Sequence, residues 1–259
     1  MKNHFFLIFS ILFLLLNCGG SDSSESSWEV DTTNMESKDH NGDWIIVHEL
    51  SDKDGLNPFT STGAGGTYIY GNNIFEGMLV QDNKTLAYVP QIATTLPTVS
   101  DDKKTYTFTL RKDVTFSDGT PLTGEDVIFS LKSIKNPFTD AAPLRNYYKD
   151  VAKAELVNGD PYIVKFTCSE VYFKHEVFIG SALYVLPKHV YDPNGYMDKY
   201  SFDDLNKLLY QFTEDNSSLE TFKNEPAYMF ADYFNSHEVS RNPVGSGPYV
   251  FKEWRTDDR

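Results

Sequence analysis

The sequence predicts an α/β protein of the mixed α+β kind, and three local patterns support that prediction. From Thr105 to Leu110, threonines alternate with large apolar residues, which is typical of a strand with one buried face. At Thr123, a residue suited to a helix N-terminus precedes an acidic residue and apolar residues at helical spacing. From Val151 to Thr167, two apolar runs flank Asn158-Gly159, a dipeptide that favours a hairpin turn.

The first elements expected along the chain are a strand, a corner and a helix. Trp44–Leu50 is predicted to be a strand, and Leu56-Asn57-Pro58-Phe59 then turns the chain because proline ends a β-ladder. The glycines between Thr60 and Thr67 allow a neighbouring chain or a ligand to approach the backbone closely, and a flexible connector is the alternative. Apolar residues from Tyr68 to Val80 predict a helix, although two glycines weaken it.

The central stretch runs from the alternating strand through a turn into the capped helix. Val114 and Phe116 continue the alternation as far as Asp118-Gly119, where a short polar side chain and a glycine suit a tight turn. The helix that starts at Thr123 places Val127, Leu131 and Ile134 on one face. Asn136-Pro137 ends that helix, because the residue before a proline disfavours helical geometry.

The last third of the chain contains two predicted helices and a predicted strand. A capped helix opens at Ser201, an aromatic-rich helix covers Tyr228–Phe234, and Val244–Trp254 is expected to be a glycine-containing entry into a strand. His189 could be a metal ligand, but no other histidine has suitable spacing with it. We therefore expect a hydrogen-bonded structural histidine.

Composition restricts the classes of partner. The net charge is −14 and the pI is about 4.8, so the chain repels phosphate backbones and nucleic acid is not an expected partner. No sequence pattern indicates a nucleophile with its base, a zinc-binding helix or a phosphate loop, so neither an enzyme nor a cofactor is predicted. The two cysteines, Cys18 and Cys168, have different meanings, and Cys168 is expected to be a small buried thiol.

The N-terminus has the pattern of an export signal. A short apolar run, Phe5–Leu16, follows a lysine and ends close to Cys18, as in the lipobox of bacterial lipoproteins. We expect residues 1–18 to be a lipoprotein signal peptide that ends at the lipidated Cys18, and residues 19–43, which are small and polar, to be a flexible tether. The alternative is an ordinary secretory signal with an incidental cysteine.

Three motifs in order resemble one protein family. Tyr106–Arg111, Phe116–Gly119 and Leu122–Val127, with the Leu56–Phe59 corner before them and Pro243–Tyr249 after them, resemble the family-5 extracellular solute-binding proteins of ABC importers. Members of that family bind oligopeptides, dipeptides or nickel.

The resemblance implies a fold and a domain division. The expected fold is that of a type II periplasmic binding protein, with an incomplete first lobe formed by residues 44–67 and 169–259. An accessory subdomain is expected at residues 68–168, and the second lobe is expected to be absent from this chain, which we therefore expect to be part of a longer protein.

The resemblance also implies a function. We expect a lipid-anchored component that captures peptides, namely oligopeptides or dipeptides, outside the bacterial cytoplasm and delivers them to a membrane permease. The alternatives are a surface lipoprotein used for sensing or adhesion, and a binder of nickel or another small solute. The residues expected to contact ligand are Thr60, Ser61, Thr62, Gly63 and Ala64.

Overall fold

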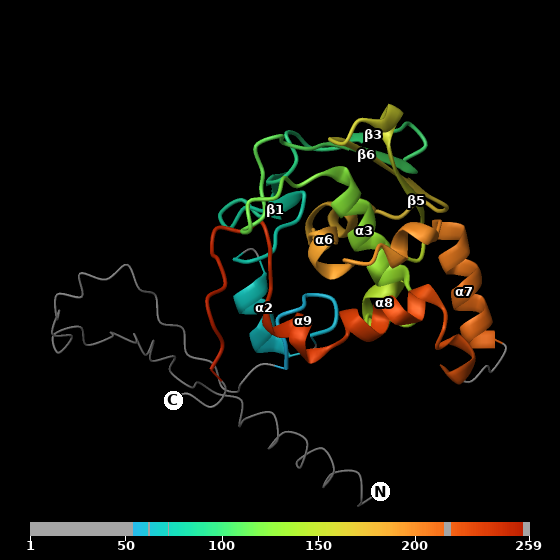
Figure 1. Cartoon of the computed structure of the whole chain (residues 1–259). Coiled ribbons are helices and arrows are strands. Elements are labelled where there is room, and N and C mark those ends of the chain that lie inside the picture. Colours follow the sequence, from blue (N-terminus) through green and yellow to red (C-terminus); the bar gives the residue numbers. More distant parts are fainter. Residues whose placement is uncertain (1–53, 62, 72, 215–218, 256–259) are drawn as a thin grey trace, which may run out of the picture. The chain divides into compact units, whose positions relative to one another are not determined.

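The computed structural model describes residues 54–61, 63–71, 73–214 and 219–255, all within the unit His48–Arg259 (Figure 1). The expected signal peptide, Cys18, the tether, the strand Trp44–Leu50 and Thr62 lie outside the described residues. Among the residues that are described, no helix is both long enough and apolar enough to cross a membrane.

The first part of the described chain corrects one prediction. The helix expected over Tyr68–Val80 is wrong: helix α2 covers Ala64–Tyr70, and the chain then extends to strand β1, Leu79–Gln81, which pairs antiparallel with β2, Tyr88–Pro90. Gly77 shows why no helix continues there. A Cβ atom at Gly77 would lie 2.7 Å from the backbone oxygen of Ser181, so a distant segment packs directly on an extended backbone.

A four-stranded antiparallel sheet confirms the strand predicted from Thr105 to Leu110 and the two strands predicted between Val151 and Thr167. Its strands are β3 (Thr98–Val99), β4 (Thr105–Thr109), β5 (Val151–Leu156) and β6 (Ile163–Cys168), in the order β3-β4-β6-β5. Within β4 the large apolar side chains, Tyr106 and Phe108, are buried and the threonines face outward, as the alternation predicts.

Helix α3, Gly124–Lys135, lies where the capping pattern predicts it. The amide and hydroxyl groups of Thr123 donate to the Asp126 carboxylate at 2.9 and 3.0 Å, which fixes the start of the helix. Val127, Leu131 and Ile134 are each fully buried. The turn before the helix is also confirmed, since Gly119 has a φ of 88°, a backbone conformation that glycine adopts without strain.

Helices α6, α7 and α8 lie around α3 on the side away from the sheet (Figure 1). The α-helices are α4 (Ala142–Arg145), α5 (His175–Val177), α6 (Lys188–Tyr191), α7 (Phe202–Glu214), α8 (Pro226–Phe234) and α9 (His237–Arg241). The other turns are η2 (Asn146–Tyr148), η3 (Val157–Gly159), η4 (Phe178–Ala182), η5 (Tyr196–Lys199) and η6 (Leu219–Phe222). The helices predicted after Ser201 and at Tyr228–Phe234 are therefore confirmed as α7 and α8.

The strand predicted within Val244–Trp254 is wrong. These residues form no strand in the structure, although they run past Asn73 and Ile74. The Gly247 amide donates to the carbonyl of Ile74, and the Tyr249 amide donates to the carbonyl of Asn73. Gly247 and Tyr249 are two residues apart but donate to carbonyls of adjacent residues, whereas in a ladder they would donate to carbonyls two residues apart. A regular ladder therefore does not form, and the segment remains an extended loop.

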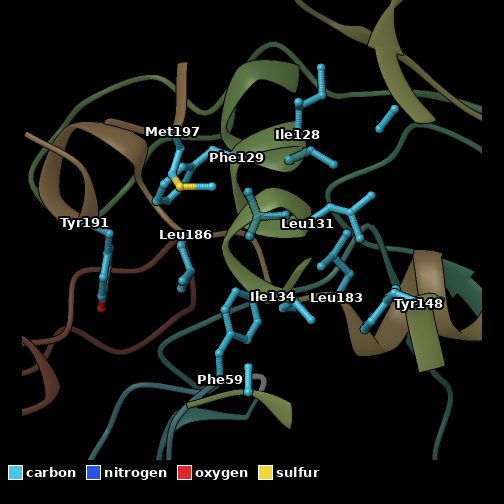
Figure 2. Packing of buried hydrophobic residues seen from close by; sticks show 14 of the residues in the cluster. Phe59, Ile128, Phe129, Leu131, Ile134, Tyr148, Leu183, Leu186, Tyr191 and Met197 are labelled. Carbon is cyan, nitrogen blue, oxygen red and sulfur yellow. The ribbon is translucent and has the colours of Figure 1, made fainter. Parts of the chain in front are cut away.

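One apolar core connects most of these elements. In Figure 2, Phe129, Leu131 and Ile134 of α3 lie among side chains from much later in the sequence, including Leu186, Tyr191 and Met197. The cluster of buried residues continues from Phe59 to Val239. The position of each loop around α3 is therefore set by burial of its apolar side chains.

Phe108→Ala should destabilise the protein strongly. The Phe108 ring is fully buried and packs edge-on against Phe166, with ring centroids 5.9 Å apart. Removing a buried phenylalanine ring typically costs about 3–5 kcal/mol, because the transfer free energy is lost and a cavity remains. Thr109→Ala, at an exposed position of the same strand, should change the unfolding free energy by less than about 1 kcal/mol. Chemical denaturation of both variants measures the difference, and equal stabilities would contradict the burial.

Candidate ligand-facing surface

The Leu56–Phe59 corner is held rigidly by the C-terminal helices. Asn57 is fully buried, and its side-chain amide donates to the carbonyl of Phe234 at 3.2 Å while its side-chain oxygen accepts from the Phe59 amide at 3.1 Å. The Leu56 amide donates to the carbonyl oxygen of Ser240 at 2.8 Å. These hydrogen bonds tie the buried corner to α8 and α9, so the loop that follows starts from a fixed position.

The Asp54 carboxylate closes the loop of predicted ligand residues. Its two oxygens accept from the Ser61 hydroxyl at 2.6 Å and from the Gly63 amide at 3.0 Å. Thr60 and Ser61 are half-buried, Gly63 is the residue before α2, and Ala64 is the first residue of that helix. The structure thus brings Ser61 and Gly63 together through a residue that the sequence did not single out.

The Pro243–Tyr249 segment lies against the residues that follow α2. A Cβ atom at Gly245 would lie 1.9 Å from the carbonyl oxygen of Ile74, and one at Gly247 would lie 2.3 Å from that of Asn73. Only glycine permits these contacts, because each would otherwise place a side chain inside a backbone group. The Ser117 amide donates to the carbonyl of Gly245 at 2.9 Å. Two segments that resemble family motifs, Phe116–Gly119 and Pro243–Tyr249, therefore meet here beside Asn73 and Ile74.

His189 is a structural residue, as the sequence predicts. Its Nε2 atom lies 2.6 Å from a carboxylate oxygen of Asp118 and its ring packs on Phe116. Partial burial raises the pKa of the Asp118 carboxyl, but hydrogen bonds from the Thr120 amide and from His189 outweigh burial and hold that pKa below its usual value. The contact joins the Asp118-Gly119 turn to α6.

Cys168 has the environment of an inert thiol. It is 2% exposed and free, and burial raises the pKa of its thiol to about 11. The thiolate is the reactive form of cysteine, and a group with this pKa remains protonated at neutral pH. The prediction of a small buried thiol is confirmed.

Solved structures of bacterial binding proteins have the same fold. The oligopeptide-binding protein AppA from Bacillus subtilis, in complex with a nonapeptide, superposes on 81% of this chain with a TM-score of 0.59 and 22% identity. NikZ from Campylobacter jejuni, in complex with Ni(L-His), superposes on 80% with a TM-score of 0.56 and 22% identity. The chain covers 34% and 32% of these two structures, respectively. The described residues therefore have part of the fold of a type II periplasmic binding protein.

The sequence comparison defines the family. The model of bacterial extracellular solute-binding proteins, family 5 Middle, matches residues 87–259, so the chain belongs to this family. Protein XP55 of Streptomyces lividans is 26% identical over 215 residues, which are 83% of this chain and 31% of that protein. The glutathione-binding protein GsiB of Salmonella typhimurium is 41% identical over 161 residues, which are 62% of this chain and 23% of that protein.

The family is one of binding proteins and not of enzymes, which agrees with the sequence-based prediction. The chain spans about a third or less of the length of the relatives named here. Sequence reasoning missed Asp54 and Ser240, which fix the loop and the corner. Asp54 has no distinguishing local pattern, and Ser240 is 184 residues from its partner Leu56.

Gly245→Ala should loosen the contact between these segments. The new methyl group would overlap the carbonyl of Ile74, so the hydrogen bonds from Ser117 to Gly245 and from Gly247 to Ile74 should weaken. Hydrogen exchange at the Ser117 and Gly247 amides should accelerate by about tenfold or more, as expected for a local opening that becomes easier.

Ser246→Ala is the matched control for this prediction. The Ser246 hydroxyl is buried and has no hydrogen-bond partner among the described residues, so its removal should leave the exchange rates nearly unchanged. Similar exchange in the two variants would show that the glycine contact does not fix the segment.

Proposed function

We propose that this chain forms one wall of the solute site of a lipid-anchored binding protein that captures peptides for an ABC importer. The observation that carries the proposal is the family match over residues 87–259, together with the fixed surface built by the Asp54–Ala64 loop and the Pro243–Tyr249 segment. The named relatives include an oligopeptide-binding protein and a glutathione-binding protein. Both ligands are peptides, which favours a peptide over nickel or a sugar.

Recognition is proposed to use backbone and hydroxyl groups of Thr60, Ser61, Thr62, Gly63 and Ala64. An extended peptide exposes a row of amide and carbonyl groups that such a loop can pair with. The Ser61 hydroxyl and the Gly63 amide donate to the Asp54 carboxylate, which places a negative charge beside this loop. The Asp54 carboxylate would therefore favour the positively charged end of a peptide at this loop.

The proposed domain division follows from the resemblance to this family. Residues 44–67 and 169–259 are assigned to the first lobe and residues 68–168 to an accessory subdomain. The contacts of Leu56 with Ser240 and of Phe59 with Phe234, whose rings are 6.3 Å apart, support a link between the two pieces of that lobe. The whole protein is proposed to act outside the cytoplasm, facing the periplasm or the cell exterior, and to deliver solute to membrane permease subunits.

Peptides should bind the chain weakly and at this surface. The exposed fraction is 58% for Tyr249 and 69% for Val250, so a ligand here stays hydrated on one side and its polar contacts largely exchange with water. We expect a Kd near 1 mM, about −4 kcal/mol, for a pool of di- to pentapeptides. An NMR titration should shift the amides of Thr60, Ser61 and Gly247.

The outer face of the sheet is the internal control for this titration. Thr107 and Lys165 lie on strands β4 and β6 and should not shift. Peptide-induced shifts confined to the sheet, or no shifts at any concentration, would contradict the proposed site. A response to Ni²⁺ in place of peptide would favour the nickel-binding alternative.

Cys18 should carry the lipid anchor. The apolar run before Cys18 and the polar tether after it predict cleavage and acylation at this residue. In cells fed a labelled fatty acid, the wild-type chain should incorporate label and Cys18→Ala should lose it. The other cysteine provides the control, because Cys168→Ala removes a buried thiol and should leave labelling intact. Equal labelling of all three chains would exclude acylation at Cys18.

A further inference from the structure

A cavity of about 520 Å³ lies at the C-terminal end of α3, and its lining contains none of the residues proposed to face the peptide. It is formed by the loop Pro137–Asp140, the start of α4, α7 and α8, which come together at this end of α3 (Figure 1). Its volume falls within the range of about 300–1,000 Å³ that is usual for small-molecule sites. Neither the peptide hypothesis nor the packing of the core requires such a cavity.

One wall of the cavity is aromatic. The Phe138 ring lies 5.2 Å from Phe212 and 5.5 Å from Tyr228, both in edge-to-face arrangements. Phe138 is 8% exposed, whereas Phe212 and Tyr228 are half-buried and present part of their rings to the cavity. This wall suits an apolar side chain of a ligand.

Arg145 supplies a fixed positive charge. Its Nη1 atom donates to the carbonyls of Asn136 and Thr139, each at 2.8 Å, which holds the guanidinium at the cavity. Its Nε and Nη2 atoms have no hydrogen-bond partner, and no carboxylate forms an ion pair with it, among the described residues. Burial lowers the pKa of Arg145, and the charge of Asp140 offsets part of that effect. The remaining N–H groups of the guanidinium can therefore donate hydrogen bonds to an anionic partner.

The Thr139 hydroxyl is a buried polar group at the same cavity. Thr139 lines the cavity and is 1% exposed, and its hydroxyl makes no hydrogen bond with a described residue. A buried hydroxyl without a partner is uncommon in native proteins, because the lost hydrogen bond to water is not replaced. A ligand carboxylate beside Arg145 could accept a hydrogen bond from this hydroxyl after rotation of the threonine side chain.

Two carboxylates provide the opposite charge. Asp140 and Asp232 line the cavity, are exposed, and form no ion pair with any residue in the described part of the chain. The position of Asp140 is fixed because its amide donates to Asn235 at 3.1 Å, and the Asn235 side chain in turn donates to the Phe138 carbonyl at 3.1 Å. The cavity thus presents both signs of charge beside an aromatic wall.

We propose that this cavity binds an apolar α-amino acid in its zwitterionic form. The carboxylate of the amino acid pairs with Arg145 and Thr139, and its ammonium group lies near Asp140 and Asp232. Its side chain packs on Phe138, Phe212 and Tyr228. A ligand with a single charge pairs either with Arg145 and Thr139 or with the two carboxylates, and it leaves the other part of the site without a partner. The site should therefore select the zwitterion.

L-Phenylalanine is the probe that tests this inference. In an NMR titration of the full chain, it should shift the amides of Asp140, Asp232 and Asn235. 2-Phenylethylamine lacks the carboxylate and 3-phenylpropanoate lacks the ammonium group, and each should bind about tenfold more weakly because one charge-assisted contact is lost. Equal affinities for the three compounds would overturn the proposed charge recognition.

Variants of the two carboxylates that line the cavity provide a second test of the inference. Asp140→Asn combined with Asp232→Asn keeps the shape of the cavity and should weaken L-phenylalanine about tenfold, whereas binding of the anionic 3-phenylpropanoate should stay the same or strengthen because two negative charges are removed. Asp101→Asn, at an exposed carboxylate in the turn between β3 and β4, is the matched control and should have no effect. The inference is wrong if L-phenylalanine causes no shifts, if the control weakens binding equally, or if shifts occur only at residues 60–64 and 245–249. In the last case the amino acid binds the surface proposed for peptides, so the two hypotheses are separable.

Discussion

The Asp126 carboxylate is the polar contact on which the arrangement around α3 depends. It is 7% exposed, and while one oxygen caps the helix through Thr123, the other accepts from the Lys188 amide at 3.0 Å. One turn later, Ser130 accepts from the Leu186 amide at 2.9 Å. Residues on one face of α3 therefore fix both the start of that helix and the segment that leads into α6. Removing the carboxylate would leave the half-buried Lys188 and Thr123 amides without their partner, which costs more than the hydrogen bonds contribute.

The elements that could be predicted from the sequence are those set by neighbouring residues. The strand at Thr105–Thr109, the turn at Gly119 and helix α3 each depend on side chains within a few positions, so alternation and capping are sufficient. The predicted helix over residues 68–80 and the strand within 244–254 failed for a different reason. Their conformations depend on the backbone at Ser181 and at Ile74, which no local pattern reveals. Long-range backbone contact overrode local propensity at both places.

The candidate surface was predictable only in part for the same reason. Leu56–Phe59 was singled out because a proline corner is a local feature, but its hydrogen-bond partners Phe234 and Ser240 come from helices near the other end of the described chain. The Asp54 carboxylate and the Arg145 guanidinium lie at their sites through loop closure and helix packing. Neither residue has a neighbour pattern that distinguishes it from an ordinary charged surface residue.

The glycines at 245 and 247 also restrict how a binding protein of this family could move. The sequence suggested a flexible entry into a strand, because glycine is conformationally permissive. In the structure both glycines serve close packing, since their α-carbons lie against the carbonyls of Ile74 and Asn73 and their segment is hydrogen-bonded to Ser117. Rotation within this segment would break those contacts together. If the complete protein closes around a solute, this segment should therefore move together with Ile74 and Ser117 and should not bend within itself.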